Sequence, residues 1–163
     1  MLPGKLLYRE MLVRDLLNRH WCYARDLTTP AESGASLVIH SAPRRADDTS
    51  ACGWSGVDLL APVEEQLEAV RRTRRMGLGS YAQACLERQR RGHIQLVVTV
   101  GSFVALGADI VALDVRGGRT VLSLRPPGAW FARFDGARLE TDLGAERRWL
   151  VLETGAQVMR RTP

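Results

Sequence analysis

Residues 94–134 constrain the fold more than any other part of the chain, because short β-strand patterns alternate there with tight turns. Four of these patterns are separated by turns that contain glycine: residues 94–100, 103–106, 110–116 and 119–125. A fifth, residues 130–134, follows Pro126-Pro127-Gly128. Short strands at close spacing are typical of a small, strongly bent antiparallel barrel. The predicted class is therefore α+β, with such a barrel preceded by two or three α-helices.

Three helical patterns precede the strands. Residues 5–25 repeat apolar side chains at helical spacing, with charged residues on the other side. A second helix is expected to start near Pro62, because proline suits the first turn of a helix. A third is expected over residues 81–91, capped by Ser80 and ended by Gly92.

Residues 28–56 are rich in Thr, Pro, Ser, Gly and Asp, which favours a flexible linker. Leu37-Val38-Ile39 is the one apolar run within it, an isolated strand or an anchor. This composition predicts three parts: an N-terminal amphipathic helix over 1–27, a linker over 28–56, and a domain over 57–163 that holds the helical arm and the barrel. Nearly all β structure is then expected after residue 92, including a last hairpin over 149–153 and 156–160.

The charge balance favours an anionic partner. The 163 residues include 23 basic and 18 acidic ones, a net charge of +5, and Lys5 is the only lysine. Arginine is suited to phosphate and carboxylate, so nucleic acid, acidic proteins and anionic lipid all remain compatible. Cys22, Cys52 and Cys85 form no CxxC pair, which indicates reduced thiols. With no long apolar stretch, a soluble cytoplasmic protein without a membrane partner is expected.

An arginine set at two helix ends is the main candidate for a binding site. Its members are Arg71, Arg72, Arg74, Arg75, Arg88, Arg90 and Arg91. These groups either complement the helix dipoles as solvated ends or form one basic face for a phosphate backbone. Residues 130–134 also alternate aromatic side chains with arginine, and Phe131 with Arg133 is the pair expected to point outward for stacking on bases.

Other chemistry has little support in the sequence. His20-x-Cys22 lacks two further ligands at metal-binding spacing, so neither metal nor cofactor is predicted. Asp109 is interpreted as a turn residue after Gly107, and Asp114 falls on the opposite strand face, which argues against a carboxylate pair. No GxSxG, GxGxxG or Walker pattern occurs, so a non-enzymatic protein is expected.

Residues 80–134 resemble the Sm-like (Lsm) small barrel, in which a short helix leads into five bent antiparallel strands. The quoted helix over 81–91 and the strand patterns up to residue 134 fit that order. The resemblance implies RNA binding and ring assembly. A second similarity is to PilZ domains, which bind cyclic di-guanylate: Arg71 to Arg75 match RxxxR, and 114–118 loosely match the D/NxSxxG element.

The sequence thus favours an adaptor protein that binds RNA or DNA with little sequence preference. The alternative from another class is a protein–protein module, in which the N-terminal helix and strand edges build an oligomer or a larger assembly. A PilZ-like cyclic-dinucleotide binder is the minor alternative.

Overall fold

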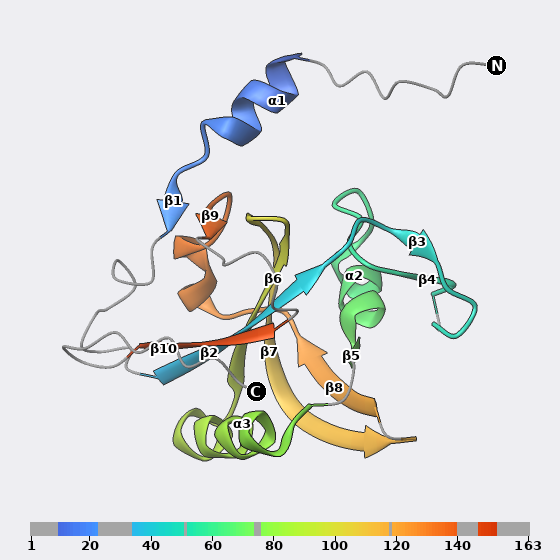
Figure 1. Ribbon diagram of the computed structural model, residues 1–163, viewed down its shortest axis with the longest axis vertical. Helices are drawn as coiled ribbons and strands as arrows, with labels where there is room; N and C mark the ends of the chain where they lie inside the picture. Colours follow the sequence, from blue (N-terminus) through green and yellow to red (C-terminus); the bar gives the residue numbers. More distant parts are fainter. Residues whose placement is uncertain are drawn as a thin grey trace.

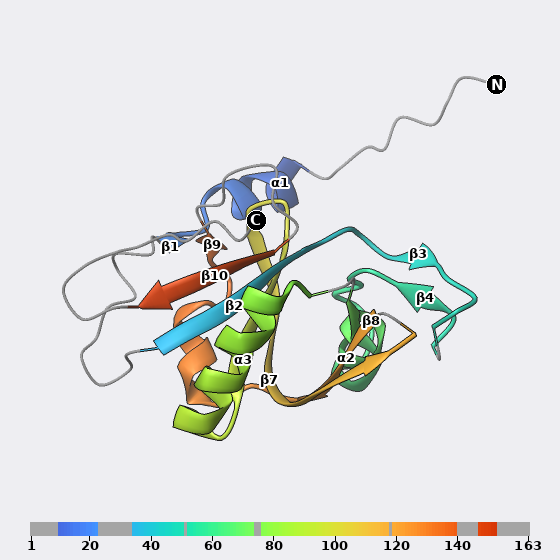
Figure 2. The ribbon, with the colours of Figure 1, turned by 60° about the horizontal axis from the view of Figure 1, so that its bottom comes forward.

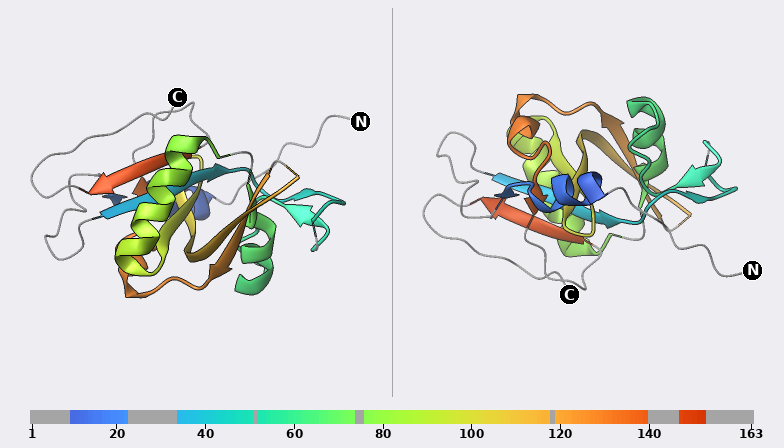
Figure 3. Two further views of the ribbon diagram at one scale, coloured as in Figure 1. Left: turned by 90° about the horizontal axis from the view of Figure 1, so that it is seen from below. Right: turned by 90° about the horizontal axis from the view of Figure 1, so that it is seen from above.

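The computed structural model describes residues 10–22, 34–50, 52–73, 76–117, 119–139 and 147–152. Within them, an eight-stranded mixed sheet lies between helices, and a small two-stranded sheet projects from one side (Figure 1). Helix α3 crosses one face of the large sheet, whereas α1 lies beyond the other face (Figure 3). The predicted α+β class is confirmed.

The helices are α1 (Glu10–Leu17), α2 (Val63–Val70), α3 (Leu78–Arg91) and the 3-10 helix η3 (Ala129–Arg133). The strands are β1 (Trp21–Cys22), β2 (Gly34–Ser41), β3 (Arg45–Ala46), β4 (Trp54–Ser55), β5 (Arg72–Thr73), β6 (Ile94–Val100), β7 (Phe103–Arg116), β8 (Arg119–Arg125), β9 (Arg138–Leu139) and β10 (Arg147–Leu152).

Predictions based on local signals are confirmed for α2, for the end of α3 and for two central strands. Helix α2 begins directly after Pro62, and α3 ends at Gly92, whose φ of 75° is accessible to glycine. Strands β6 and β8 cover the predicted residues. The predicted cap is wrong, because α3 begins at Leu78 after Gly77, before Ser80.

Strand β2 lies inside the span that the sequence assigned to a flexible linker. It pairs in parallel with β6 and antiparallel with β10, and Leu37 and Val38 are almost fully buried. The expectation that nearly all β structure follows residue 92 is therefore wrong. Strand β10 covers the first half of the predicted last hairpin, and its second half lies outside the described residues.

Strand β7 runs through Gly107 without a turn, which corrects the predicted break at residues 107–109. A Cβ at Gly107 would lie 2.2 Å from Cδ2 of Phe131, so glycine is needed for close packing rather than for a turn. Residues 103–110 of β7 pair with β6, and residues 109–116 pair with β8. The main strand path ends at β1 and β10, and the described strands form no closed barrel.

Two hydrophobic clusters cover the two faces of the sheet. Ala84 of α3 packs with Leu96 and Ile110 on one face. On the other, Phe134 packs with Val97 and Leu139, and Phe131 joins them at the edge. These clusters fix η3 and β9 against the face opposite α3.

The segment that carries β3 and β4 extends away from the large sheet (Figure 2). Trp54 is buried within it, and the guanidinium of Arg44 lies over its ring at 4.8 Å. Arg44 also donates to Asp58 across the base of the segment at 2.8 Å. No helix in the described part of the chain is long and apolar enough to cross a membrane.

Candidate nucleic-acid interface

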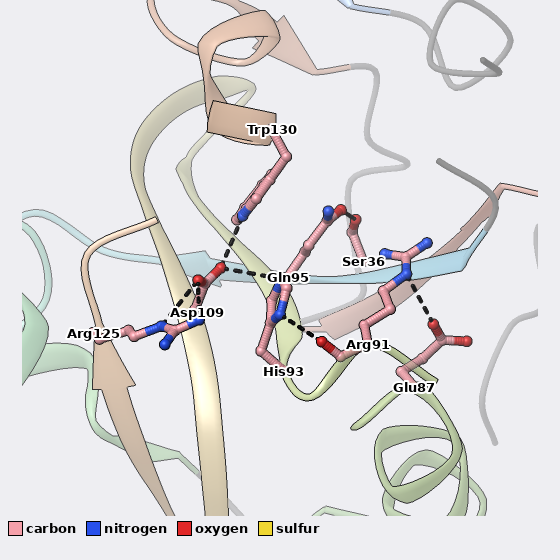
Figure 4. A network of polar contacts seen from close by, with 8 residues as sticks. All are labelled: Ser36, Glu87, Arg91, His93, Gln95, Asp109, Arg125 and Trp130. Carbon is pink, nitrogen blue, oxygen red and sulfur yellow. Dashed lines mark hydrogen bonds and ion pairs between the residues drawn. The ribbon is translucent and has the colours of Figure 1, made fainter. Parts of the chain in front are cut away.

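Four polar side chains form a row across the sheet on the face that η3 covers. Strand register aligns Ser36 with Gln95 and Gln95 with Asp109, and Asp109 is in turn aligned with Arg125. The hydroxyl of Ser36 donates to Oε1 of Gln95 at 2.8 Å, and Nε of Arg125 donates to Oδ2 of Asp109 at 3.1 Å. We call Ser36, Gln95, Asp109 and Arg125 the polar row (Figure 4).

Asp109 is the centre of this network. Its side chain is 4% exposed, and it accepts a 2.8 Å hydrogen bond from the indole N–H of Trp130 in η3. Nε2 of His93 lies 3.6 Å from the same carboxylate oxygen, and Nδ1 of His93 lies 3.1 Å from the carbonyl oxygen of Arg91. Since a buried carboxylate needs partners, these contacts hold η3, β8 and the start of β6 together.

The interpretation of Asp109 as a turn residue after Gly107 is wrong. The residue lies inside β7, at the point where β6, β7 and β8 run side by side. The position of Asp109 in a strand was hard to predict, because a strand buried on both faces shows no alternation of apolar and polar residues.

A second buried carboxylate, that of Glu87, forms ion pairs with two of the predicted arginines. Gln83 donates to Glu87 at 2.9 Å, and the carboxylate lies 3.8 Å from Arg90 and 3.9 Å from Arg91. The Arg91 side chain is only 16% exposed. Arg88, at the same end of α3, is exposed and forms no ion pair with a described residue.

The remaining predicted arginines precede α3 in the chain. Arg71 follows α2 and lies 3.2 Å from Glu68, while Arg72 is in β5, where only its backbone is described. Arg74 and Arg75 lie outside the described residues. Among the described members, Arg90 and Arg91 share the carboxylate of Glu87, whereas Arg71 pairs with Glu68.

The segment with Phe131 and Arg133 is a 3-10 helix, so the predicted strand over 130–134 is wrong. Phe131 does not point outward, because its ring packs against Gly107 and is nearly parallel to that of Phe134. Arg133 lies over the ring of Phe134 at 5.2 Å. Trp130 anchors this helix to Asp109, which sets the position of both residues.

A stack of aromatic rings and arginine does occur, at a place that the sequence did not indicate. The guanidinium of Arg138 lies 4.1 Å from the ring centroid of Trp21 and 5.0 Å from that of Phe103. β1 pairs with β9, and the N–H of Arg138 donates to the carbonyl of His20 at 2.8 Å. We call Trp21, Phe103 and Arg138 the stacked surface.

The stacked surface is joined to η3 as well as to the sheet edge. The thiol of Cys22 lies 3.7 Å from the carbonyl of Arg133, and Cys22 is buried against Phe134 and Leu139. Exposed His20 directly precedes Trp21. Within the described residues, no carboxylate pairs with Arg138. This surface thus combines aromatic rings with the positive charge of Arg138, which pairs with no carboxylate among the described residues.

Comparisons with known proteins found no match: no family model, no curated protein and no solved structure matches this chain. In the described part of the chain, no group of three His, Cys, Asp or Glu side chains is placed to hold a metal ion.

Proposed function

We propose that this chain is a non-enzymatic binding protein that holds RNA or DNA through phosphates, with little sequence preference. The observation that carries the proposal is the position of Arg138 between two aromatic rings. The rings lie over the guanidinium and its Nε atom is buried, so its terminal N–H groups are the ones that would donate to an acceptor. Because the side chain is already ordered, less conformational entropy is lost when a phosphate binds.

The net charge of +5 supports the same proposal, because a basic surplus attracts polyanions. Arg88, exposed at the end of α3, is a second candidate for phosphate contact. Arg88 lies on the side of the sheet opposite η3. It would therefore contact a different part of a long nucleic acid from Arg138, or make no contact with it.

The test is binding of labelled random RNA and DNA, measured by fluorescence anisotropy across a salt series. Each phosphate that an arginine neutralises releases a counterion, so Arg138→Ala is expected to lower the salt slope by about one. Arg116→Ala is the matched control. It removes the same charge at the far end of β7, where Arg116 is 71% exposed and pairs with Asp114. Absence of binding by the wild-type chain at low salt would refute the proposal.

A protein-binding role is the second candidate, and a separate apolar patch favours it. Leu59, Leu60 and Val63, just before and at the start of α2, are 62%, 96% and 44% exposed. Adjacent exposed apolar side chains often mark contact sites. Sedimentation of wild type and Leu60→Asp over a concentration series tests self-association, since only loss of association in the variant supports a contact through this patch.

A further inference from the structure

We infer that copies of this chain associate head to tail, with the outer side of α3 in one copy on the apolar patch before α2 in the next. This inference goes beyond nucleic-acid binding, and it rests on the protein-binding candidate and names its partner. The patch consists of Leu59, Leu60 and Val63. A second exposed apolar surface lies on α3, and the two surfaces are bordered by charges of opposite sign.

Helix α3 turns an apolar side to solvent, whereas a surface helix normally turns its polar side chains outward. Glu87 is 2% exposed, but the next residue, Leu86, is 53% exposed, and Tyr81 is 37% exposed. The helical period places Tyr81, Ala82, Cys85 and Leu86 within one arc of the helix surface. We call these four residues the α3 stripe. Contiguous exposed apolar side chains of this kind mark contact sites.

The charges beside the two surfaces are complementary. Arg88 and Arg90 are exposed directly after the α3 stripe, and Glu87, the only acidic residue of α3, is buried. Glu64 and Glu65 are exposed in the first turn of α2, where they form no ion pair with a described residue, and α2 contains no basic residue. Opposite charges bring two surfaces together and fix their register. A second copy therefore supplies both the apolar side chains and the charges that match each surface.

These two surfaces meet between copies rather than within one chain. Leu67 of α2 and Ala84 of α3 belong to the same hydrophobic cluster, but the two helices lie apart (Figures 1 and 3). A contact between different surfaces of identical chains leaves one of each surface free, so it continues into a closed ring or an open chain. A contact between two like surfaces stops at a dimer. The two arrangements can therefore be distinguished by mass.

The experiment measures the weight-average mass of the full chain and its variants by sedimentation equilibrium over a concentration series. The mass of the wild type should rise beyond that of a dimer. Leu60→Asp and Leu86→Asp should each raise the dissociation constant roughly 10- to 150-fold, because the burial of one leucine in the contact is lost. An equimolar mixture of the two variants should associate again and stop at the dimer, since each variant keeps one intact surface.

Leu17→Asp is the matched control, because Leu17 of α1 is 60% exposed but belongs to neither surface. This variant should associate as the wild type does. The charges are tested separately: Arg88→Glu should weaken association, and Glu64→Arg added to the same chain should restore part of it. Failure of that recovery would refute the charge pairing on which the head-to-tail contact depends.

Three other results would overturn the inference, and they are distinguishable. If Leu60→Asp alone abolishes association and the mixture does not restore it, like surfaces meet, so the protein-binding candidate stands while the head-to-tail contact is refuted. Loss of association in Leu17→Asp would place the contact on α1. A wild type that stays monomeric refutes self-association altogether, whereas nucleic-acid binding is decided independently by the salt series. Circular dichroism of each variant shows that a loss of association does not come from unfolding.

Discussion

Asp109 shows how a single residue links the sheet to the proposed binding surface. Asp109 accepts a hydrogen bond from Trp130 of η3, and the chain continues from η3 into β9, which carries Arg138. We expect Asp109→Asn to lower the free energy of unfolding by about 1–3 kcal/mol, because the charged acceptor for Arg125 and the indole is lost. Urea unfolding measures this change.

Asp114→Asn is the control, since it replaces the same side chain on the same strand. Asp114 is 63% exposed and pairs with an exposed arginine, so its loss should alter stability by less than about 0.5 kcal/mol. Equal effects of the two variants would show that the buried position of Asp109 contributes nothing.

Gly107 and Gly79 should respond in opposite directions to replacement by alanine. A Cβ at Gly107 would meet Phe131 at 2.2 Å, so Gly107→Ala is expected to destabilise the protein by about 1–3 kcal/mol. Gly79 lies within α3 and has nothing within 4 Å of a new Cβ, so Gly79→Ala should stabilise it by up to about 1 kcal/mol. Thermal unfolding of both variants decides the matter, and a stabilising Gly107→Ala would contradict the packing described.

At the scale of elements, the sequence predicts what local signals determine. Pro62 and Gly92 mark helix ends through backbone chemistry that acts within a few residues, and both predictions hold. The prediction of a turn at Gly107 is wrong because this glycine allows close packing against Phe131, which is distant in sequence. The aromatic residues of η3 suit a strand as well as a helix, and their local pattern predicts a strand. The hydrogen bond from Trp130 to Asp109, which holds η3 in place, joins residues that are distant in sequence.

The candidate site was less predictable than the elements. An arginine cluster can be read from neighbouring positions, but the carboxylates that its members pair with, Glu68 and Glu87, cannot be assigned from that pattern. Trp21, Phe103 and Arg138 come together only through the pairing of β1 with β9 and of β9 with β7. No local pattern records such a contact.

The segment that carries β3 and β4 should respond to acid at its base. The hydrogen bond from Arg44, followed by that from the N–H of Leu60, lowers the pKa of Asp58 from its ordinary value of 3.8. A lowered folded-state pKa means that the carboxylate contributes stability above pH 3.8, and that this contribution is lost as the pH falls through the folded-state pKa.

An NMR titration of the carboxyl groups tests this assignment. The midpoint for Asp58 should lie below 3.8 and should move back towards 3.8 in Arg44→Ala. Asp47 is an internal control, because the hydroxyl and N–H of Thr49 chiefly lower its pKa. Its midpoint should stay low in the variant, and a parallel rise would indicate a general change of the segment.

At the scale of the whole molecule, β2 decides how the chain can be divided. The composition of residues 28–56 suggests a stable fragment that starts at residue 57, but β2 lies between β6 and β10. A fragment of residues 57–163 would lose the buried side chains of Leu37 and Val38, worth about 1.5–3 kcal/mol each, and would expose β6. That loss is comparable with the whole stability of a small domain.

We therefore expect the fragment 57–163 to show no cooperative thermal transition by circular dichroism, whereas the fragment 34–163 should keep one. The longer fragment retains β2 and omits α1 and β1, so it also lacks Trp21. It should consequently fold yet bind random RNA and DNA more weakly than the full chain, because Arg138 loses the ring of Trp21 that orders its side chain. A cooperative transition in the shorter fragment would show that β2 is dispensable. Full affinity for RNA and DNA in the longer one would place the binding surface away from β1.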